Sequence, residues 1–267
     1  MKHNNQPIGI FDSGLGGLTV LKELKNILPD ESFIYFGDTA HLPYGTKSKK
    51  TIIKYSNQIC KFLIKKKVKL IIVACNTASA LAIETLEKYI TVPIINVIDP
   101  CIQHAIQTTR KKSIGIIGTQ ATINSKAYEI KLNQLNNNLD IITQACPLFV
   151  PIIEEGLSSH QISKDICKLY LNKKQFLRID VLILGCTHYP LLINTIKNYI
   201  SKNIIIIDSA NIVAIFVKKF LHENNLTTSN QNQQYIKYFL TDESIQFNKL
   251  ASIFSREDSL DIKFIKL

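Results

Sequence analysis

The sequence has no long hydrophobic run, and this absence limits where the protein can reside. In 267 residues, no apolar segment approaches the length of about 20 residues that a membrane-spanning helix needs. The apolar part of the opening MKHNNQPIGIF is too short for a secretory signal peptide. We therefore expect no membrane partner and a cytoplasmic location.

The sequence also lacks the cysteine spacing of a structural metal site or of a disulfide framework. None of its cysteines forms a CxxC pair, and no further Cys/His cluster has ligand spacing. The six cysteines are Cys60, Cys75, Cys101, Cys146, Cys167 and Cys186. This pattern fits free thiols in a reducing compartment better than it fits a disulfide framework or a metal site. We predict no bound metal.

Acidic residues are in the minority, and the formal net charge is +11. A basic stripe interleaved with aromatic residues is typical of nucleic-acid binding, but here no aromatic interleaving accompanies the lysines. The densest runs, at 47–50, 65–67 and 110–112, fall at the ends of expected helices, where cations complement the helix dipole or face water. We therefore predict no nucleic-acid partner.

Short apolar runs alternate with longer segments of helical period, which predicts parallel strands joined by crossover helices. Strands are expected at 8–11, 33–37, 69–74, 93–98, 113–118, 140–145, 180–185 and 204–208. An asparagine- and glutamine-rich loop over 222–234 is expected to precede a last strand, helix and strand. The pattern indicates an α/β protein.

A faint internal repeat runs through these elements. IGIFDSG, from Ile8, resembles IGIIGTQ, from Ile114. LIIVACNTA, with Cys75, resembles VLILGCTHYP, with Cys186, at nearly the same spacing. The repeat predicts two similar α/β halves.

Cys75 and Cys186 are each expected at the carboxyl end of a parallel strand, where open α/β sheets bind their ligands. A helix that begins after each thiol would lower its pKa and supply amide donors for an anion. Two related halves that face each other would set the two thiols across one cleft. One thiolate could then take a proton from a carbon while the other thiol returns one, which inverts the centre.

Two glycine-containing motifs follow the first two expected strands. FDSGLGGLTV places Asp12 and Ser13 at the end of the first strand, but Thr19 occupies the last glycine position of a dinucleotide fingerprint. Its glycines are equally compatible with a tight turn. DTAHLPYGTKS places Tyr44 and Gly45 after the second strand, and alone this is ordinary turn chemistry.

Of the motifs that could carry chemistry, the segment CTHYP is the most specific. His188 lies two residues from Cys186, close enough to act as a proton partner or to hold a charge beside the thiol. The same pair could be two ligands of a metal ion, but the sequence offers no further ligands with suitable spacing. It could also be the nucleophile and base of a Cys/His hydrolase. The hydrolase would leave Cys75 unexplained.

These motifs, together with ACPLFVPIIEEG, occur in an order and spacing that resemble the cofactor-independent glutamate racemases of bacterial cell-wall synthesis, in the aspartate/glutamate racemase family. The resemblance extends from about residue 8 to residue 210. It implies an α/β fold of two pseudo-symmetric domains, each a mostly parallel sheet flanked by helices, with the active site in the interdomain cleft. The first domain would comprise 1–99 plus 208–267, and the second 100–207. No pyridoxal phosphate or metal cofactor is implied.

The resemblance also implies roles for individual residues. Cys75 and Cys186 match the two catalytic acid/bases. Asp12 matches the carboxylate that assists the first thiol. Glu154, rather than Glu155, and His188 match the pair placed around the second thiol. Substrate contacts fall on Asp12, Ser13, Tyr44, Gly45, Asn76, Thr77, Thr187 and His188. Thr119 and Thr122 are further candidates for holding a carboxylate.

The function implied by the resemblance is two-base interconversion of L- and D-glutamate, which supplies D-glutamate for peptidoglycan synthesis, in a homodimer. In the family the first thiol deprotonates the D isomer and the second the L isomer. An aspartate or hydantoin racemase is the nearest alternative, because two thiols do not fix the substrate side chain. A two-domain protein that binds an amino acid without chemistry is the alternative from another class.

Overall fold

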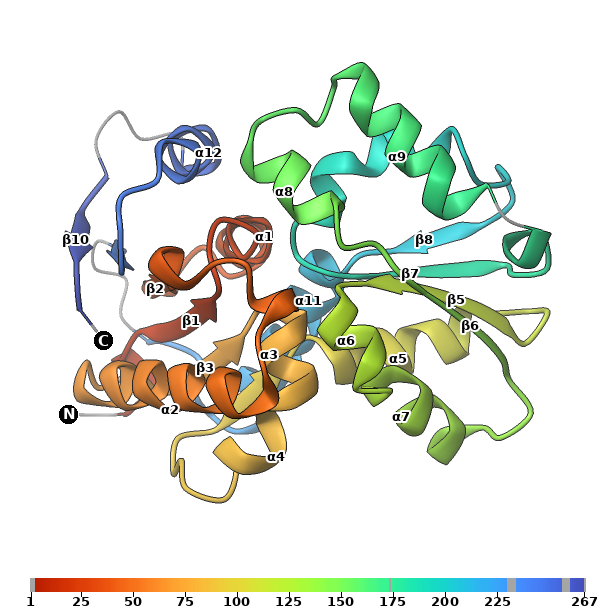
Figure 1. Cartoon of the computed structure of the whole chain (residues 1–267). Helices are drawn as coiled ribbons and strands as arrows, with labels where there is room; N and C mark the ends of the chain where they lie inside the picture. The colour runs from red at the N-terminus through yellow and green to blue at the C-terminus, as the bar shows by residue number, and fades with distance from the viewer. Residues whose placement is uncertain (1–2, 173, 230–233, 256–259, 267) are drawn as a thin grey trace.

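The computed structural model describes residues 3–172, 174–229, 234–255 and 260–266. In these residues the chain forms two sheets flanked by helices, and all strand pairs are parallel (Figure 1). The first sheet has the order β10-β9-β2-β1-β3-β4 and the second β6-β5-β7-β8. The predicted α/β class is confirmed.

The strands of the first sheet are β1 (Ile8–Asp12), β2 (Phe33–Gly37), β3 (Leu70–Val73), β4 (Ile94–Asn96), β9 (Ile236–Leu240) and β10 (Ile262–Phe264). Those of the second are β5 (Ser113–Gly118), β6 (Asp140–Ala145), β7 (Val181–Gly185) and β8 (Ile205–Ile207). The order β2-β1-β3-β4 recurs as β6-β5-β7-β8, so the internal repeat of the sequence corresponds to a repeated topology.

The helices are α1 (Leu18–Ile27), α2 (Lys49–Lys65), α3 (Asn76–Leu81), α4 (Ile83–Leu86), α5 (Ile98–Thr108), α6 (Gln120–Asn124), α7 (Ala127–Leu135), α8 (Phe149–Glu154), α9 (Gln161–Leu171), α10 (Ile193–Lys197), α11 (Ser209–Glu223) and α12 (Ile245–Ser255). Short 3-10 helices include η2 (Thr39–His41), η3 (Tyr44–Thr46) and η5 (Tyr189–Leu192). No helix in the described part of the chain is both long and apolar enough to cross a bilayer.

The strand expected at 93–98 is shorter than the prediction. It ends at Asn96, because the Asn96 side chain accepts hydrogen bonds from the amides of Ile98 and Asp99, both at 3.0 Å, and so opens α5. The closing strand, helix and strand of the prediction are β9, α12 and β10. The loop predicted over 222–234 starts two residues too early, because His222 and Glu223 belong to α11, and its residues 230–233 lie outside the described residues.

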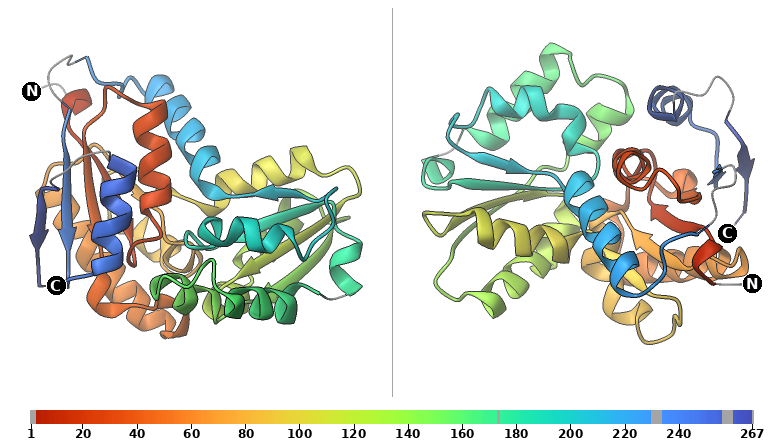
Figure 2. Two further views of the ribbon diagram at one scale, coloured as in Figure 1. Left: turned by 90° about the horizontal axis from the view of Figure 1, so that it is seen from above. Right: turned by 180° about the vertical axis from the view of Figure 1, so that it is seen from behind.

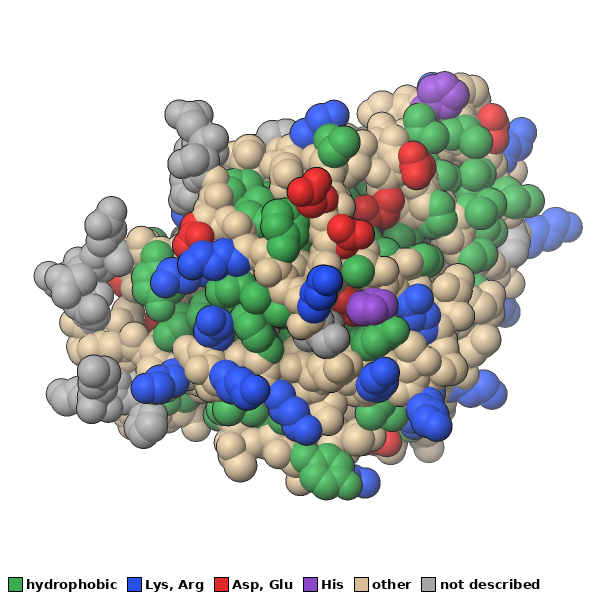
Figure 3. All heavy atoms as spheres, turned by 60° about the vertical axis from the view of Figure 1, so that its left-hand side comes forward, with side chains coloured by type: hydrophobic (Ala, Val, Ile, Leu, Met, Phe, Trp, Pro, Cys, Tyr) green, Lys and Arg blue, Asp and Glu red, His purple; other side chains and the backbone are tan. Residues whose placement is uncertain are grey.

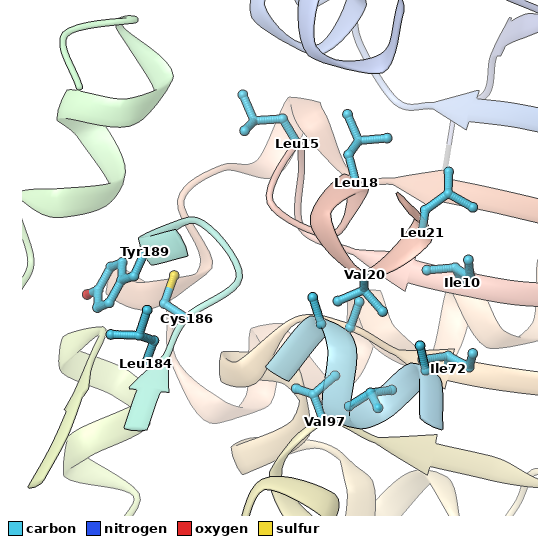
Figure 4. Packing of buried hydrophobic residues seen from close by; sticks show 14 of the residues in the cluster. Ile10, Leu15, Leu18, Val20, Leu21, Ile72, Val97, Leu184, Cys186 and Tyr189 are labelled. Carbon is cyan, nitrogen blue, oxygen red and sulfur yellow. The ribbon is translucent and has the colours of Figure 1, made fainter. Parts of the chain in front are cut away.

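The helix α11 links the two halves. It packs against α1 and α5, and Figure 2 shows it between the two sheets. The largest buried apolar cluster likewise includes Ile10 and Ile72 of the first sheet and Leu182 and Leu184 of the second. Figure 4 shows part of this cluster, with Cys186 beside Tyr189 at the end of β7. The domain boundaries at 99/100 and 207/208 stay a prediction.

The positive charge lies on many separate exposed side chains. The exposed lysines of α2 are Lys49, Lys50, Lys54, Lys61 and Lys65. On the face in Figure 3, Lys and Arg side chains are spread out, with uncharged and hydrophobic atoms between them. The expected absence of a nucleic-acid partner stays a prediction.

Candidate active site

A narrow cavity lies at the carboxyl ends of strands from both sheets, with a free volume of about 30 Å³. Ten residues that the sequence proposed for the site line it: Ser13, Tyr44, Gly45, Cys75, Asn76, Thr77, Thr119, Cys186, Thr187 and His188. Leu42, Pro43, Thr46, Gln120, Pro147 and Val150, which the sequence analysis did not propose, complete the wall. Both thiols therefore open onto one cavity.

Cys75 follows β3 and caps the first turn of α3. Its Sγ accepts a hydrogen bond from the Ala78 amide at 3.5 Å and donates one to the Ser13 hydroxyl at 3.7 Å. Burial nevertheless raises the pKa of the Cys75 thiol to about 12, and the negative charge of Asp12 adds to the rise. The Ala78 amide at the start of α3 lowers this pKa, as predicted for a helix N-terminus, but burial outweighs this effect.

Asp12 lies behind the cavity wall and is fully buried at the end of β1. Its Oδ2 accepts a hydrogen bond from the Gly14 amide at 2.9 Å. Its Oδ1 accepts one from the Thr187 hydroxyl at 3.3 Å. Since Thr187 follows β7, this bond joins the first-sheet half of the site to the second.

Cys186 follows β7, and its surroundings differ from those of Cys75. The next helical element is the 3-10 helix η5, which begins at Tyr189. His188 Nδ1 lies 3.9 Å from Cys186 Sγ, and His188 Nε2 lies 2.5 Å from Glu154 Oε1, at the end of α8. Glu154, rather than Glu155, thus supplies the carboxylate next to the imidazole.

His188 is held between an acid and a thiol. Burial alone would lower its pKa, but the hydrogen bonds to Cys186 and Glu154, and the charges of those groups, raise the pKa of His188 to about 10. The imidazole is therefore protonated near neutral pH. A positive charge then stands beside Cys186.

Three threonine hydroxyls meet where α3 approaches α6. The Thr77 hydroxyl lies 2.9 Å from that of Thr119 and 3.2 Å from that of Thr122, and the last two are 2.9 Å apart. Thr77 and Thr119 line the cavity, whereas Thr122 lies behind them. The cluster gives the cavity hydroxyl groups that can turn toward an anionic ligand.

Asn76 offers the cavity an acceptor. Its amide Nδ2 donates to the Tyr128 hydroxyl on α7 at 2.8 Å. Its Oδ1 is buried and has no hydrogen-bond partner among the described residues. A buried acceptor without a partner is costly, and a donor group of a bound ligand would satisfy it.

Gly16 permits the close approach of the two halves. A Cβ placed on it would lie 2.4 Å from both His188 Nδ1 and Thr187 Oγ1. From the sequence alone, the glycines of this motif are compatible with a tight turn. The role of Gly16 could not be read from the sequence, because the atoms that need the space come from the other half of the chain.

In the part of the chain that the structure describes, no three His, Cys, Asp or Glu side chains cluster as the ligands of a metal ion would. Both imidazole nitrogens of His188 already face a protein partner, Cys186 on one side and Glu154 on the other. This arrangement suits the transfer of protons.

Two α/β halves with the same strand order, and one thiol from each half on a shared cavity, define a bilobal enzyme with its site between the lobes. The sequence profile of the Asp/Glu/hydantoin racemases matches residues 8–216, and the chain belongs to this family. It is therefore an isomerase of the racemase type.

Known proteins resemble the chain over nearly its whole length. A glutamate racemase from Geobacter metallireducens is 43% identical over 247 residues, which cover 92% of each chain. The crystal structure of a glutamate racemase from Francisella tularensis in complex with D-glutamate has a TM-score of 0.90, with 38% identity over 98% of each chain. A glutamate racemase isoform from Bacillus anthracis has a TM-score of 0.93, with 35% identity over 99% of each chain.

Proposed function

We propose that the protein is a glutamate racemase that moves protons with Cys75 and Cys186. The observation that carries this proposal is the placement of one thiol from each half on the same cavity, with Asp12 near the first and the His188–Glu154 pair beside the second. The similarity to glutamate racemases, one of them in complex with D-glutamate, supports glutamate as the substrate.

The two thiols have different surroundings. The pKa of about 12 keeps the Cys75 thiol protonated near neutral pH. The positively charged imidazole of His188 lies beside Cys186. Cys186 then takes the α-proton of L-glutamate on one face, and Cys75 gives its own proton to the carbon on the opposite face. D-glutamate leaves, and in the reverse direction Cys75 is the base.

The carbanion needs support, because the α-proton of an amino acid is very weakly acidic and a thiolate is a weak base for it. We assign this support to the polar groups of the cavity wall. The hydroxyls of Ser13, Thr77 and Thr119, with Thr122 behind them, hold carboxylates. The Asn76 Oδ1 accepts from the substrate ammonium, and Tyr44, Gly45 and Thr187 complete the binding wall. Fixing the carbon between two thiols supplies much of the remaining rate enhancement.

We infer that the reaction needs neither pyridoxal phosphate nor a metal ion. We further propose a cytoplasmic enzyme that acts as a homodimer and supplies D-glutamate for peptidoglycan synthesis. The membership of the chain in a family of racemases and its likeness to glutamate racemases support this role.

The test is α-proton exchange and inversion of L- and D-glutamate in deuterated buffer, with metal-stripped protein free of pyridoxal phosphate. The wild type should invert both isomers, and Cys75→Ala and Cys186→Ala should each lose inversion by at least about a thousandfold. Cys60→Ala, at an equally buried thiol on α2, is the matched control and should keep wild-type turnover.

Several outcomes would count against parts of this proposal. Fast exchange from L-glutamate in Cys186→Ala would refute the assignment of each thiol to one isomer. Faster turnover of aspartate than of glutamate would favour the aspartate racemase. Tight binding of glutamate without exchange would favour a non-catalytic binding protein.

A further inference from the structure

Asp38 is a buried carboxylate that the proton transfer does not use. It follows β2, is fully buried, and does not line the cavity. In the described residues its ion-pair partner is His41, whose Nδ1 lies 2.7 Å from Asp38 Oδ1. A carboxylate is expensive to bury, so this position calls for an explanation beyond packing.

Two hydroxyl groups share the carboxylate with His41. The Tyr44 hydroxyl donates to Asp38 Oδ2 at 2.5 Å, and the Thr241 hydroxyl donates to Asp38 Oδ1 at 2.8 Å. Hydrogen bonds to a buried charge are stronger and more directional than those between neutral groups. Asp38 thus fixes the positions of both donors.

One donor leads to the cavity. Tyr44 is buried, and it lines the cavity together with its neighbours Leu42, Pro43, Gly45 and Thr46. This stretch, residues 42–46, is here called the Tyr44 wall. Burial and the charge of Asp38 raise the pKa of the Tyr44 hydroxyl well above its usual value, so it remains a donor to Asp38.

The other donor leads to the C-terminal part of the chain. Thr241 follows β9, and its hydroxyl also accepts a hydrogen bond from the Ala40 amide at 2.9 Å. Next to it, Thr39 Oγ1 donates to the Asp242 carbonyl at 2.6 Å, and the Asp242 amide returns a bond at 2.9 Å. The segment before the Tyr44 wall is therefore fastened to residues about 200 positions later in the chain.

We propose that Asp38 is a positioning residue that holds the Tyr44 wall against the substrate and couples this wall to the end of β9. The kinetic part of this inference rests on the proposed racemase function. The mechanical part does not, because the wall should loosen whenever the carboxylate is altered.

The first test compares Asp38→Asn with the wild type by hydrogen exchange and kinetics. In the variant, backbone amides of residues 39–47 should exchange at least about tenfold faster, while those of α3 keep their rates. The KM of the amino acid that the wild type racemises should rise by about tenfold, with kcat changed by less than about threefold, because binding geometry is lost and the thiols are untouched.

Asp180→Asn is the matched control. Asp180 also accepts three strong hydrogen bonds, from the Thr109 hydroxyl and the Arg110 and Lys111 amides at 2.6 to 2.8 Å, but it stands at the opposite, amino end of β7. This variant should lower stability and leave KM unchanged. Thr241→Val, with Thr109→Val as its control, gives a milder second pair in case Asp38→Asn does not fold, and its KM should rise by about threefold.

An Asp38→Asn variant that loses stability but keeps the wild-type KM and exchange at residues 39–47 would overturn the proposal. Faster exchange with an unchanged KM would overturn it as well. If Asp38→Asn does not fold, an unchanged KM in Thr241→Val is the refuting result. A wild type that fails to turn over glutamate counts against the proposed function alone, because the exchange rates need no substrate.

Discussion

At the scale of single residues, the two thiols have unlike neighbours. Cys75 contacts a hydroxyl and a backbone amide and lies near the buried Asp12. Cys186 faces an imidazole whose far nitrogen meets Glu154. In the proposed reaction an asymmetric pair of thiols would serve a symmetric interconversion, and the two halves should respond differently to pH.

The His188–Glu154 pair predicts a stability change at alkaline pH. The folded state raises the pKa of His188 from 6.5 to about 10, so its stabilising contribution is complete below about pH 6.5 and is lost as the pH rises to about 10. The free energy of unfolding, measured by urea titration, should fall by a few kcal/mol over this interval, on the order set by the shift.

Glu154→Gln should lower the pKa of His188 and flatten this fall, whereas Glu155→Gln should keep the wild-type profile. NMR titration of the imidazole gives the pKa directly. Identical pH profiles for the two variants would contradict the role assigned to Glu154.

The sequence was informative about these residues where a motif and a strand end coincide, as at Cys75, Cys186 and His188. It was silent on Asp38 and Tyr128, because their partners, Thr241 and Asn76, are brought to them only by the fold. The net rise in the pKa of Cys75 could not be predicted, since local helix geometry is visible in a sequence and burial is not.

At the scale of elements, the turn between β1 and α1 fits closely against the segment after β7. Gly16→Ala would place a Cβ 2.4 Å from His188 Nδ1 and force this contact apart. We expect kcat to fall by about 100-fold, because small displacements of a catalytic group are costly. Steady-state kinetics with a thermal melt would separate this effect from unfolding.

Gly14→Ala is the control for this prediction. Its Cβ would meet the end of the Leu42 side chain at 2.6 Å, and that flexible group can move away. We expect a smaller loss than in Gly16→Ala, and the opposite ranking would contradict the explanation.

The strands were predicted well because short apolar runs of isoleucine and valine mark buried parallel strands clearly. The eight strands expected over 8–208 all occur, and the errors are at their ends, as at Asn96. After Cys186 the predicted helix takes the form of η5, a tighter 3-10 helix that the apolar period does not distinguish from an α-helix.

At the scale of the whole molecule, Lys69 joins three distant segments at the amino ends of the strands. Its Nζ donates to Glu31 Oε2 at 2.6 Å and to the carbonyls of Asn4 and Leu226 at 2.5 and 2.8 Å. Lys69→Met should cost about 3 to 5 kcal/mol in urea unfolding, because Glu31 stays buried without its cation.

Activity per folded molecule should be unchanged in Lys69→Met, since neither Lys69 nor Glu31 lines the cavity. The double variant Lys69→Met with Glu31→Gln should recover part of the stability by removing the unpaired charge. A single variant as stable as the wild type would show that the pair contributes little.

The first sheet is assembled from two separated parts of the chain, because β9 and β10 join it at β2 after the whole second sheet has been made. On the ribosome, the outer edge of β2 therefore stays unpaired while residues 113–207 are being made. The enzyme should gain activity only near the end of its synthesis, and a ribosome stalled before residue 236 would hold an inactive polypeptide with an open strand edge.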